Sequence, residues 1–115
     1  MELVITDLYG ARGQVLPAVM CSGDLDIATT EVFTSTVKRL LAEPGVTVIV
    51  NMESVPFVDS TGIGAMISCH KAAVEAGSEC RFVINVPKVL RVVEATKINE
   101  FLNIYESSSS ATDVI

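Results

Sequence analysis

A run of β-branched residues from Val46 to Asn51 constrains the fold of this chain more strongly than any other segment. Valine, isoleucine and threonine favour strands, and small aliphatic strands are expected where a sheet faces helices. An amphipathic helix is predicted just before this run, and Pro44-Gly45 ends it. We therefore expect strands that alternate with helices. The apolar face of the first helix consists of Phe33, Val37, Leu40 and Leu41, with Thr29 or Thr30 as its N-cap.

Before this helix, the sequence predicts a β-hairpin. Its strands are 3–8 and 15–21, and the turn residues of 10–13 between them indicate an antiparallel return. Pro17 lacks an N–H donor, so we expect it at a bulge or facing an unpaired edge.

After Asn51, two further helix–strand units follow a loop at 52–59 with apolar anchors at Val55, Phe57 and Val58. The predicted elements are a helix at 61–76 ended by Gly77, a strand at 79–85, a helix that begins at Pro87, a short turn at 97–102 and a strand at 103–105. The stripe of the 61–76 helix contains Ile63, Ile67, His70 and Val74. The order β-β-α-β-α-β-α-β predicts an α/β fold with a mixed sheet of four to five strands and three to four helices.

Residues 1–106 are predicted to form a single domain, and 107–115 a flexible serine-rich tail. The chain has 115 residues, of which 50% are hydrophobic and 19% charged, which is ample for one core. No apolar run approaches the roughly 20 residues that span a bilayer, and no secretory signal begins the chain, so we expect a cytoplasmic protein.

The net charge of -6 argues against nucleic acid as a partner, because phosphate binding requires Lys and Arg. Cys21, Cys69 and Cys80 are widely spaced and form no CxxC pair, so a disulfide framework or zinc site is not expected. They are interpreted as small buried hydrophobes. A redox sensor that uses Cys69 and Cys80 remains an open alternative.

The segment from Asp59 to Gly64 is the most informative for function. Ser60 stands just before a predicted helix, where it can serve as the N-cap, and a phosphate on it would meet the helix dipole and up to four free N–H donors. Gly62 and Gly64 would not block that approach. On the local pattern alone, an ordinary serine cap is the favoured interpretation.

Other chemistries fit this segment poorly. A nucleophile elbow needs a glycine where Val58 stands, and the only histidine, His70, lies about 15 Å along the helix axis. No lysine follows the glycines, so a nucleotide-binding loop is weakly indicated. Asp24, Asp26 and Asp59 could gather at one sheet edge, but hard-cation sites usually contain more oxygen ligands. We expect no metal, no cofactor and no catalytic residue, and an acidic patch beside Ser60.

Two motifs together resemble the STAS domain (sulfate transporter and anti-sigma-factor antagonist). They are Gly23-Asp24-Leu25-Asp26 after a strand and Val58-Asp59-Ser60-Thr61-Gly62-Ile63-Gly64 at the start of a helix. The likeness extends from about Leu3 to Tyr105 and includes the element order. Because the predicted domain fills the chain, the closest match is the free-standing bacterial anti-sigma-factor antagonist.

This resemblance implies a non-enzymatic phosphoprotein that switches partners. Unphosphorylated, it would bind an anti-sigma factor that is also a Ser/Thr kinase, and so release a sigma factor. The resemblance implies phosphorylation at Ser60, rather than at Thr61, and a phosphatase that reverses it. The implied partner-binding residues are Asp24, Asp26, Asp59, Ser60, Thr61, Gly62 and Ile63.

A competing hypothesis is a non-switching STAS accessory subunit of a membrane-transport complex, in which Ser60 is only a helix cap. The sequence does not identify the sigma factor, the signal, the kinase or the phosphatase. It also leaves open weak nucleotide binding and whether the chain is a monomer or a weak dimer.

Overall fold

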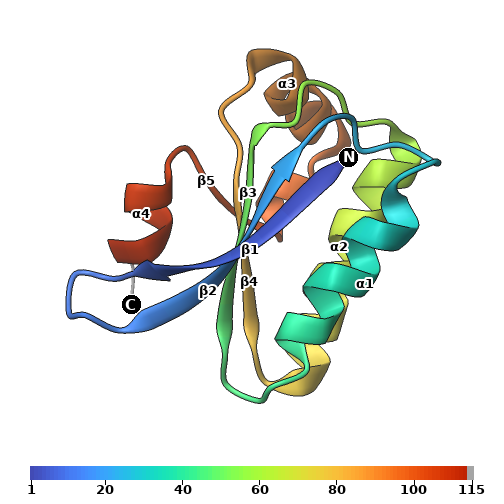
Figure 1. Cartoon of the computed structure of the whole chain (residues 1–115). Coiled ribbons are helices and arrows are strands. Elements are labelled where there is room, and N and C mark those ends of the chain that lie inside the picture. The colour runs from blue at the N-terminus through green and yellow to red at the C-terminus, as the bar shows by residue number, and fades with distance from the viewer. Residues whose placement is uncertain (114–115) are drawn as a thin grey trace.

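A five-stranded mixed sheet organises the chain, as the computed structural model of residues 1–113 shows (Figure 1). The predicted order β-β-α-β-α-β-α-β is confirmed, and the short turn expected at 97–102 is a 3-10 turn (η1). A further helix (α4) follows near the C-terminus. The elements are β1 Glu2–Tyr9, β2 Val15–Ser22, α1 Thr30–Leu41, β3 Thr47–Ser54, α2 Ser60–Ala76, β4 Glu79–Val83, α3 Pro87–Thr96, η1 Ile98–Glu100, β5 Asn103–Tyr105 and α4 Ser108–Asp113.

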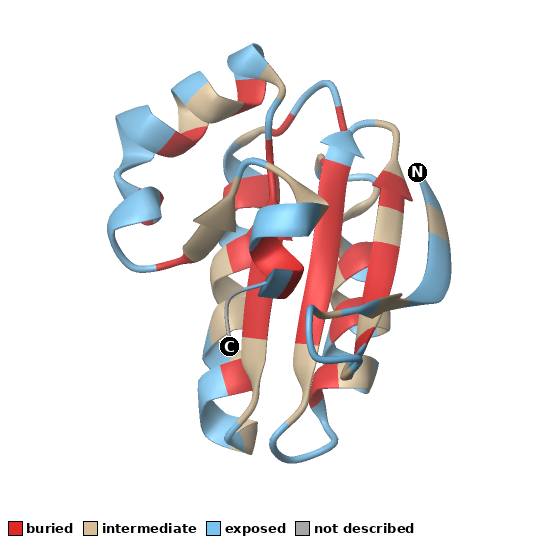
Figure 2. Cartoon of the chain, turned by 90° about the vertical axis from the view of Figure 1, so that its left-hand side faces the viewer, coloured by how far each residue is buried: buried red, intermediate tan, exposed pale blue. Residues whose placement is uncertain are grey.

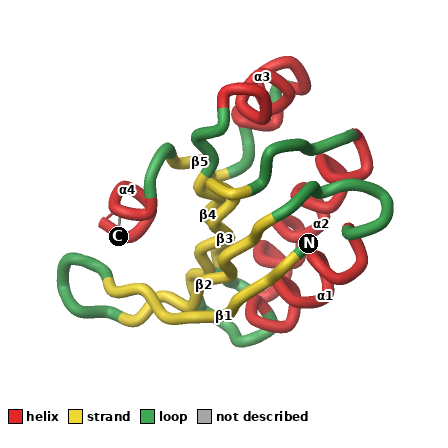
Figure 3. Tube along the Cα trace, turned by 45° about the horizontal axis from the view of Figure 1, so that its top comes forward, coloured by secondary structure: helices red, strands yellow, loops and turns green. Residues whose placement is uncertain are grey.

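The strands lie in the sheet in the order of the sequence. β1 pairs antiparallel with β2, and every later pair is parallel. Each parallel step passes through a helix, and right-handed crossovers that all progress in the same direction place their helices on the same face. The helices α1, α2 and α3 therefore cover one face of the sheet, and α4 lies on the other (Figure 3).

Two apolar cores follow from this arrangement. The larger lies between the sheet and the face of α1, α2 and α3, and it includes Phe33, Val50, Met66 and Phe82 with no exposed surface. The smaller lies under α4, where the opposite faces of the strands meet Ala111. In Figure 2 the central strands are buried along much of their length, because both of their faces are covered.

The serine-rich segment differs from the expected flexible tail. Ser108–Asp113 form α4, in which Ala111 has no exposed surface and Thr112 is 7% exposed. The Asn51 side-chain amide donates to the Ser108 hydroxyl at 3.0 Å, and the Arg81 guanidinium donates to the Ala111 carbonyl at 2.7 Å. The composition of this segment predicted disorder because the contacts that order it come from β3 and β4, and the local sequence does not show them. The last two residues of the predicted tail, 114 and 115, lie outside the described residues.

Pro17 meets one of its two alternative expectations. It does not lie at the bulge of β2, which is between Met20 and Ser22, but on the stretch of β2 that pairs with β1 and has no β3 partner. Two other local predictions need correction. Val74 is 64% exposed, so it does not belong to the buried stripe of α2. β3 extends three residues beyond Asn51, because the chain keeps pairing with β2 up to Ser54.

Two helix boundaries were predicted correctly and have clear causes. Pro87 occupies the first position of α3, where its missing N–H has no cost. Gly77 ends α2 in the left-handed conformation (φ 69°). Among the described helices, none is both long and apolar enough to span a bilayer.

Candidate functional site

Two loops meet beyond the carboxyl ends of β2 and β3. A parallel bridge pairs Leu25 with Val58, and the Leu25 N–H donates to the Phe57 carbonyl at 2.9 Å. The Asp59 N–H in turn donates to the Leu25 carbonyl at 3.3 Å. The loop of residues 23–26, which we call the acidic loop, and the start of α2 are thus adjacent, as the two motifs predicted.

Gly62 allows this close approach. A Cβ at this position would lie 2.6 Å from the Leu25 carbonyl oxygen and 2.7 Å from a Val58 methyl carbon. Neither distance is compatible with an unshifted backbone, so the first turn of α2 can touch the acidic loop only because residue 62 has no side chain. Around Gly64, in contrast, no atom of residues 1–113 from outside its own stretch of helix lies within 4 Å of an ideal Cβ.

The N-cap of α2 is Asp59, so the prediction that Ser60 caps the helix is wrong. The Asp59 carboxylate accepts from the Gly62 N–H at 2.9 Å and from the Thr61 hydroxyl at 2.5 Å. These bonds, first that from the Thr61 hydroxyl, hold the pKa of Asp59 below its ordinary value. Asp59, one residue before Ser60, is the N-cap because a charged carboxylate binds the N–H donors of the helix more strongly than a hydroxyl does.

Ser60 is therefore the first residue of α2, exposed to solvent. Within residues 1–113 its hydroxyl makes no hydrogen bond, whereas that of Thr61 is held by Asp59. The helix donors expected to receive a phosphate are partly occupied, since Asp59 already takes the Gly62 N–H. A phosphate on Ser60 would thus stand beside a carboxylate rather than in an empty anion site.

The two aspartates of the acidic loop have different surroundings. Asp24 is exposed, while Asp26 is half-buried and accepts from the Ala28 N–H at 3.0 Å. Thr29 is the N-cap residue of α1, as predicted, but its hydroxyl makes no capping bond. That hydroxyl instead donates to the Asp24 carbonyl at 2.8 Å and accepts from the Asp26 N–H, so it fixes the acidic loop.

The structure also shows which site residues face solvent. Gly62 and Ile63 are buried and support the helix from inside, whereas Asp24, Ser60 and Thr61 are exposed. In the part of the chain that the structure describes, no group of three or more His, Cys, Asp or Glu side chains is placed to hold a metal ion.

Two exposed apolar residues beside this site were missed. Ile27 is 78% exposed, and its backbone N–H is one of the groups that lower the pKa of Asp59. Phe57 is 39% exposed, with the Lys88 ammonium 5.6 Å from its ring centre, so its predicted role as a loop anchor is wrong. Val55 and Val58 do anchor the loop, both being buried. The position of Ile27, an apolar residue directly after the two aspartates of a turn, was the sequence signal that could have indicated its exposure.

The histidine and the cysteines lie apart from this surface. His70 is partly buried in α2, as predicted. The three cysteines are buried and free, and burial raises the pKa of Cys21 and of Cys69 to about 12. These thiols are protonated at neutral pH, which argues against the redox-sensor hypothesis.

The sequence profile of the STAS domain matches residues 12–111, and the chain belongs to this family. Solved structures with the same fold include an anti-sigma factor antagonist from Mycobacterium paratuberculosis, with a TM-score of 0.81 and 16% identity over 96% of this chain and 89% of that one. A STAS-domain antagonist from Planctomyces limnophilus gives 0.73 and 19% over 94% and 93%. The unphosphorylated antagonist SpoIIAA gives 0.68 and 17% over 93% and 92%.

Proposed function

We propose that this protein is an anti-sigma-factor antagonist that switches partners through phosphorylation of Ser60. Its docking face consists of the exposed residues around the two adjoining loops: Asp24, Ile27, Phe57, Ser60 and Thr61. Membership of the STAS family and the similarity of the fold to proteins described as anti-sigma factor antagonists support the general role. The switch itself is argued from the site.

The observation that carries the proposal is that Asp59, rather than Ser60, caps α2. Asp59 caps the helix, so the exposed Ser60 hydroxyl has no structural task. A kinase can therefore approach and modify it without breaking a bond that holds α2. The Thr61 hydroxyl is bound to Asp59, which favours Ser60 as the phosphoacceptor.

The switch would work through charge on an unchanged fold. The kinase of the anti-sigma factor transfers a phosphoryl group from ATP to the Ser60 oxygen, which loses its proton, and ADP leaves. The product carries about -1.5 to -2 charge at pH 7 beside Asp59. Like-charge repulsion and the bulk of the phosphate at the centre of the docking face weaken the complex. A loss of about 2.8 kcal/mol of binding free energy would lower the affinity a hundredfold. A phosphatase restores the hydroxyl. Dependence on ATP places this cycle in the cytoplasm.

Binding measurements with Ser60 variants test the proposal. Calorimetry with the anti-sigma factor should give Ser60→Ala an affinity close to wild type and Ser60→Asp an affinity at least about tenfold weaker. Ser35→Asp on exposed α1 adds the same charge away from the face and should bind normally. Ile27→Ala should weaken binding by up to about tenfold without loss of stability, since exposed apolar anchors contribute at an interface and not in the core. Equal affinity of Ser60→Ala and Ser60→Asp would refute the switch.

Mapping of the phosphosite provides a second test. Incubation with the partner kinase and ATP should label Ser60 in wild type and leave Ser60→Ala unlabelled by mass spectrometry. If neither Ser60 nor Thr61 is labelled, the non-switching role as an accessory subunit of a transport complex becomes the better hypothesis.

A further inference from the structure

A second surface lies where the β1–β2 hairpin bends away from the rest of the sheet. The hairpin and the loop between α1 and β3 enclose an open groove of about 610 Å³, which we call the hairpin groove. In Figure 1 the hairpin leaves the sheet on the side of α4, so its outer half no longer lies against β3. The groove is lined by residues 7, 14–17 and 43–47.

Within residues 1–113, the walls of the hairpin groove are strand edges that have no partner strand. Pairing between β2 and β3 begins only at Ala18 and Ile49. The preceding β2 residues, 15–17, pair with β1 alone, and Thr47 and Val48 of β3 pair with β4 alone. Unpaired strand backbone is a template for an added extended segment, which gains main-chain hydrogen bonds there, with Pro17 offering its carbonyl alone.

The side chains of the hairpin groove define the partner further. Among its lining residues, all of which the structure describes, Asp7 and Glu43 carry the only charges. The apolar part includes Val15, which is 54% exposed and pairs with Tyr9, itself 64% exposed. Two carboxylates beside an exposed apolar strip complement basic and aliphatic side chains that alternate along an extended segment.

A second copy of this chain is disfavoured as the occupant. Each copy carries a net charge of -6, and its hairpin groove already contains two carboxylates. Self-association through this surface would bring like charges together at low dielectric. We therefore propose that the hairpin groove binds an extended, basic segment of a partner protein.

This surface is separate from the proposed Ser60 face. The hairpin groove lies at the amino ends of β2 and β3, whereas the loops of Asp24 and Ser60 follow their carboxyl ends. A partner in the groove can consequently stay bound whether or not Ser60 is phosphorylated. The inference thus does not depend on the proposed function.

The test uses the ¹⁵N-labelled chain and an end-blocked peptide of about eight residues that alternates arginine and valine, the length of a strand. Titration followed by NMR should shift the amides of Asp7, Gln14 and Thr47, and added salt should weaken the binding. Asp7→Asn with Glu43→Gln should weaken it about threefold to tenfold. Glu94→Gln with Glu100→Gln, both exposed and outside the groove, changes the net charge equally and should not.

Several outcomes would overturn the inference. They are equal binding of a peptide that alternates glutamate and valine, shifts centred outside the hairpin groove, or no effect of the Asp7 and Glu43 changes. Groove amides that shift with protein concentration alone would identify a second copy as the occupant instead. Ser60→Asp should bind the peptide as wild type does, so failure of this inference leaves the Ser60 switch unaffected, and the reverse also holds.

Discussion

Single atoms decide how the start of α2 meets the acidic loop. The absence of a Cβ at Gly62 allows the helix to approach the Leu25 carbonyl, and one carboxylate oxygen of Asp59 holds both the Gly62 N–H and the Thr61 hydroxyl. The hydroxyl of Ser60, between them, makes no hydrogen bond within residues 1–113 and does not cap the helix. The exposed hydroxyl of the candidate switch therefore depends on what its two neighbours do.

Alanine at the two glycines of α2 should have opposite effects. Gly62→Ala forces the acidic loop away and should lower the free energy of unfolding by about 1–3 kcal/mol. Gly64→Ala has open space at its Cβ and should raise it by about 0.5–1 kcal/mol, because alanine loses less backbone entropy in a helix. Urea denaturation measures both. A stable Gly62→Ala protein would mean that the loop is not fixed against the helix.

The Asp59 cap predicts a dependence of stability on pH. The folded pKa of Asp59 lies below the ordinary value of 3.8, so the unfolded chain takes up a proton first as the pH falls. The contribution of Asp59 is complete above that value and is lost as the pH falls through the lowered pKa. Asp59→Asn should therefore be less stable than wild type at neutral pH, and the difference should shrink in acid. A urea series that shows a difference independent of pH would contradict this.

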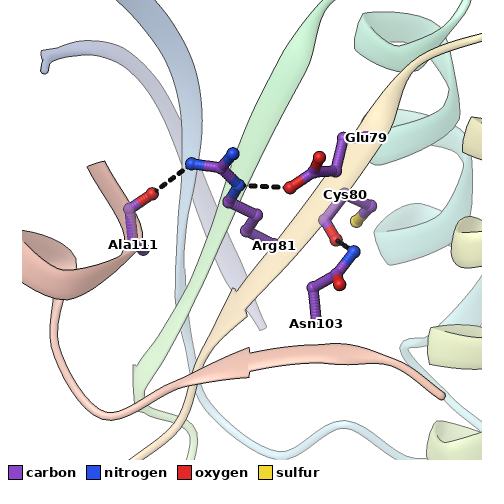
Figure 4. Close-up of polar contacts among 5 residues, drawn as sticks. All are labelled: Glu79, Cys80, Arg81, Asn103 and Ala111. Carbon is purple, nitrogen blue, oxygen red and sulfur yellow. Dashed lines mark hydrogen bonds and ion pairs between the residues drawn. The ribbon is translucent and has the colours of Figure 1, made fainter. Parts of the chain in front are cut away.

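At the scale of elements, α4 is the main departure from expectation. Arg81 is 6% exposed on the face of β4 that α4 covers, where it contacts Glu79 and donates to the Ala111 carbonyl (Figure 4). Its guanidinium also lies 5.8 Å from the ring centre of Tyr105 on β5. On the neighbouring edge the Asn103 amide donates to the Cys80 carbonyl at 3.3 Å. A six-residue helix is marginal alone, so the bonds from Arg81 and Asn51 and the burial of Ala111 stabilise it.

A charge at the buried position of α4 should release it. Ala111→Asp places a carboxylate against Ile49 and Val83, and we expect the free energy of unfolding to fall by about 1–3 kcal/mol. Amides 110–112 should lose hydrogen-exchange protection while those of β3 keep theirs. Ser109→Asp, exposed on the same helix, is the matched control and should change neither quantity. Protected α4 amides in Ala111→Asp would show that the helix needs no docking.

At the scale of the whole molecule, the core controls chemical reactivity. Cys21, Cys69 and Cys80 lie in the larger core between the sheet and its helices. Burial raises the pKa of all three thiols, and to about 12 for Cys21 and Cys69. At pH 8, a pKa of about 12 leaves only about one in ten thousand of the Cys21 and Cys69 thiols ionised.

The thiols should therefore react only when the molecule opens. A thiol reagent at pH 8 should label the cysteines slowly in the native protein and rapidly in urea, and the destabilised Gly62→Ala variant should react faster than wild type. The absorbance of the released chromophore measures the rate. Rapid labelling of a native cysteine, independent of stability, would restore the redox-sensor hypothesis for this chain.

Local sequence patterns were enough to predict the element order, the hairpin, the Gly77 and Pro87 boundaries and the proximity of the two site loops, because these follow from periodicity, turn chemistry and parallel pairing of neighbouring strands. The folded structure was needed to establish that Asp59 rather than Ser60 caps α2, that Ile27 and Phe57 face solvent, and that α4 docks. It was also needed to find the hairpin groove, which opens where β2 and β3 do not pair. Each of these depends on contacts between segments that are distant in the chain. Local sequence patterns do not show which donors, acceptors and apolar surfaces will pair across the fold.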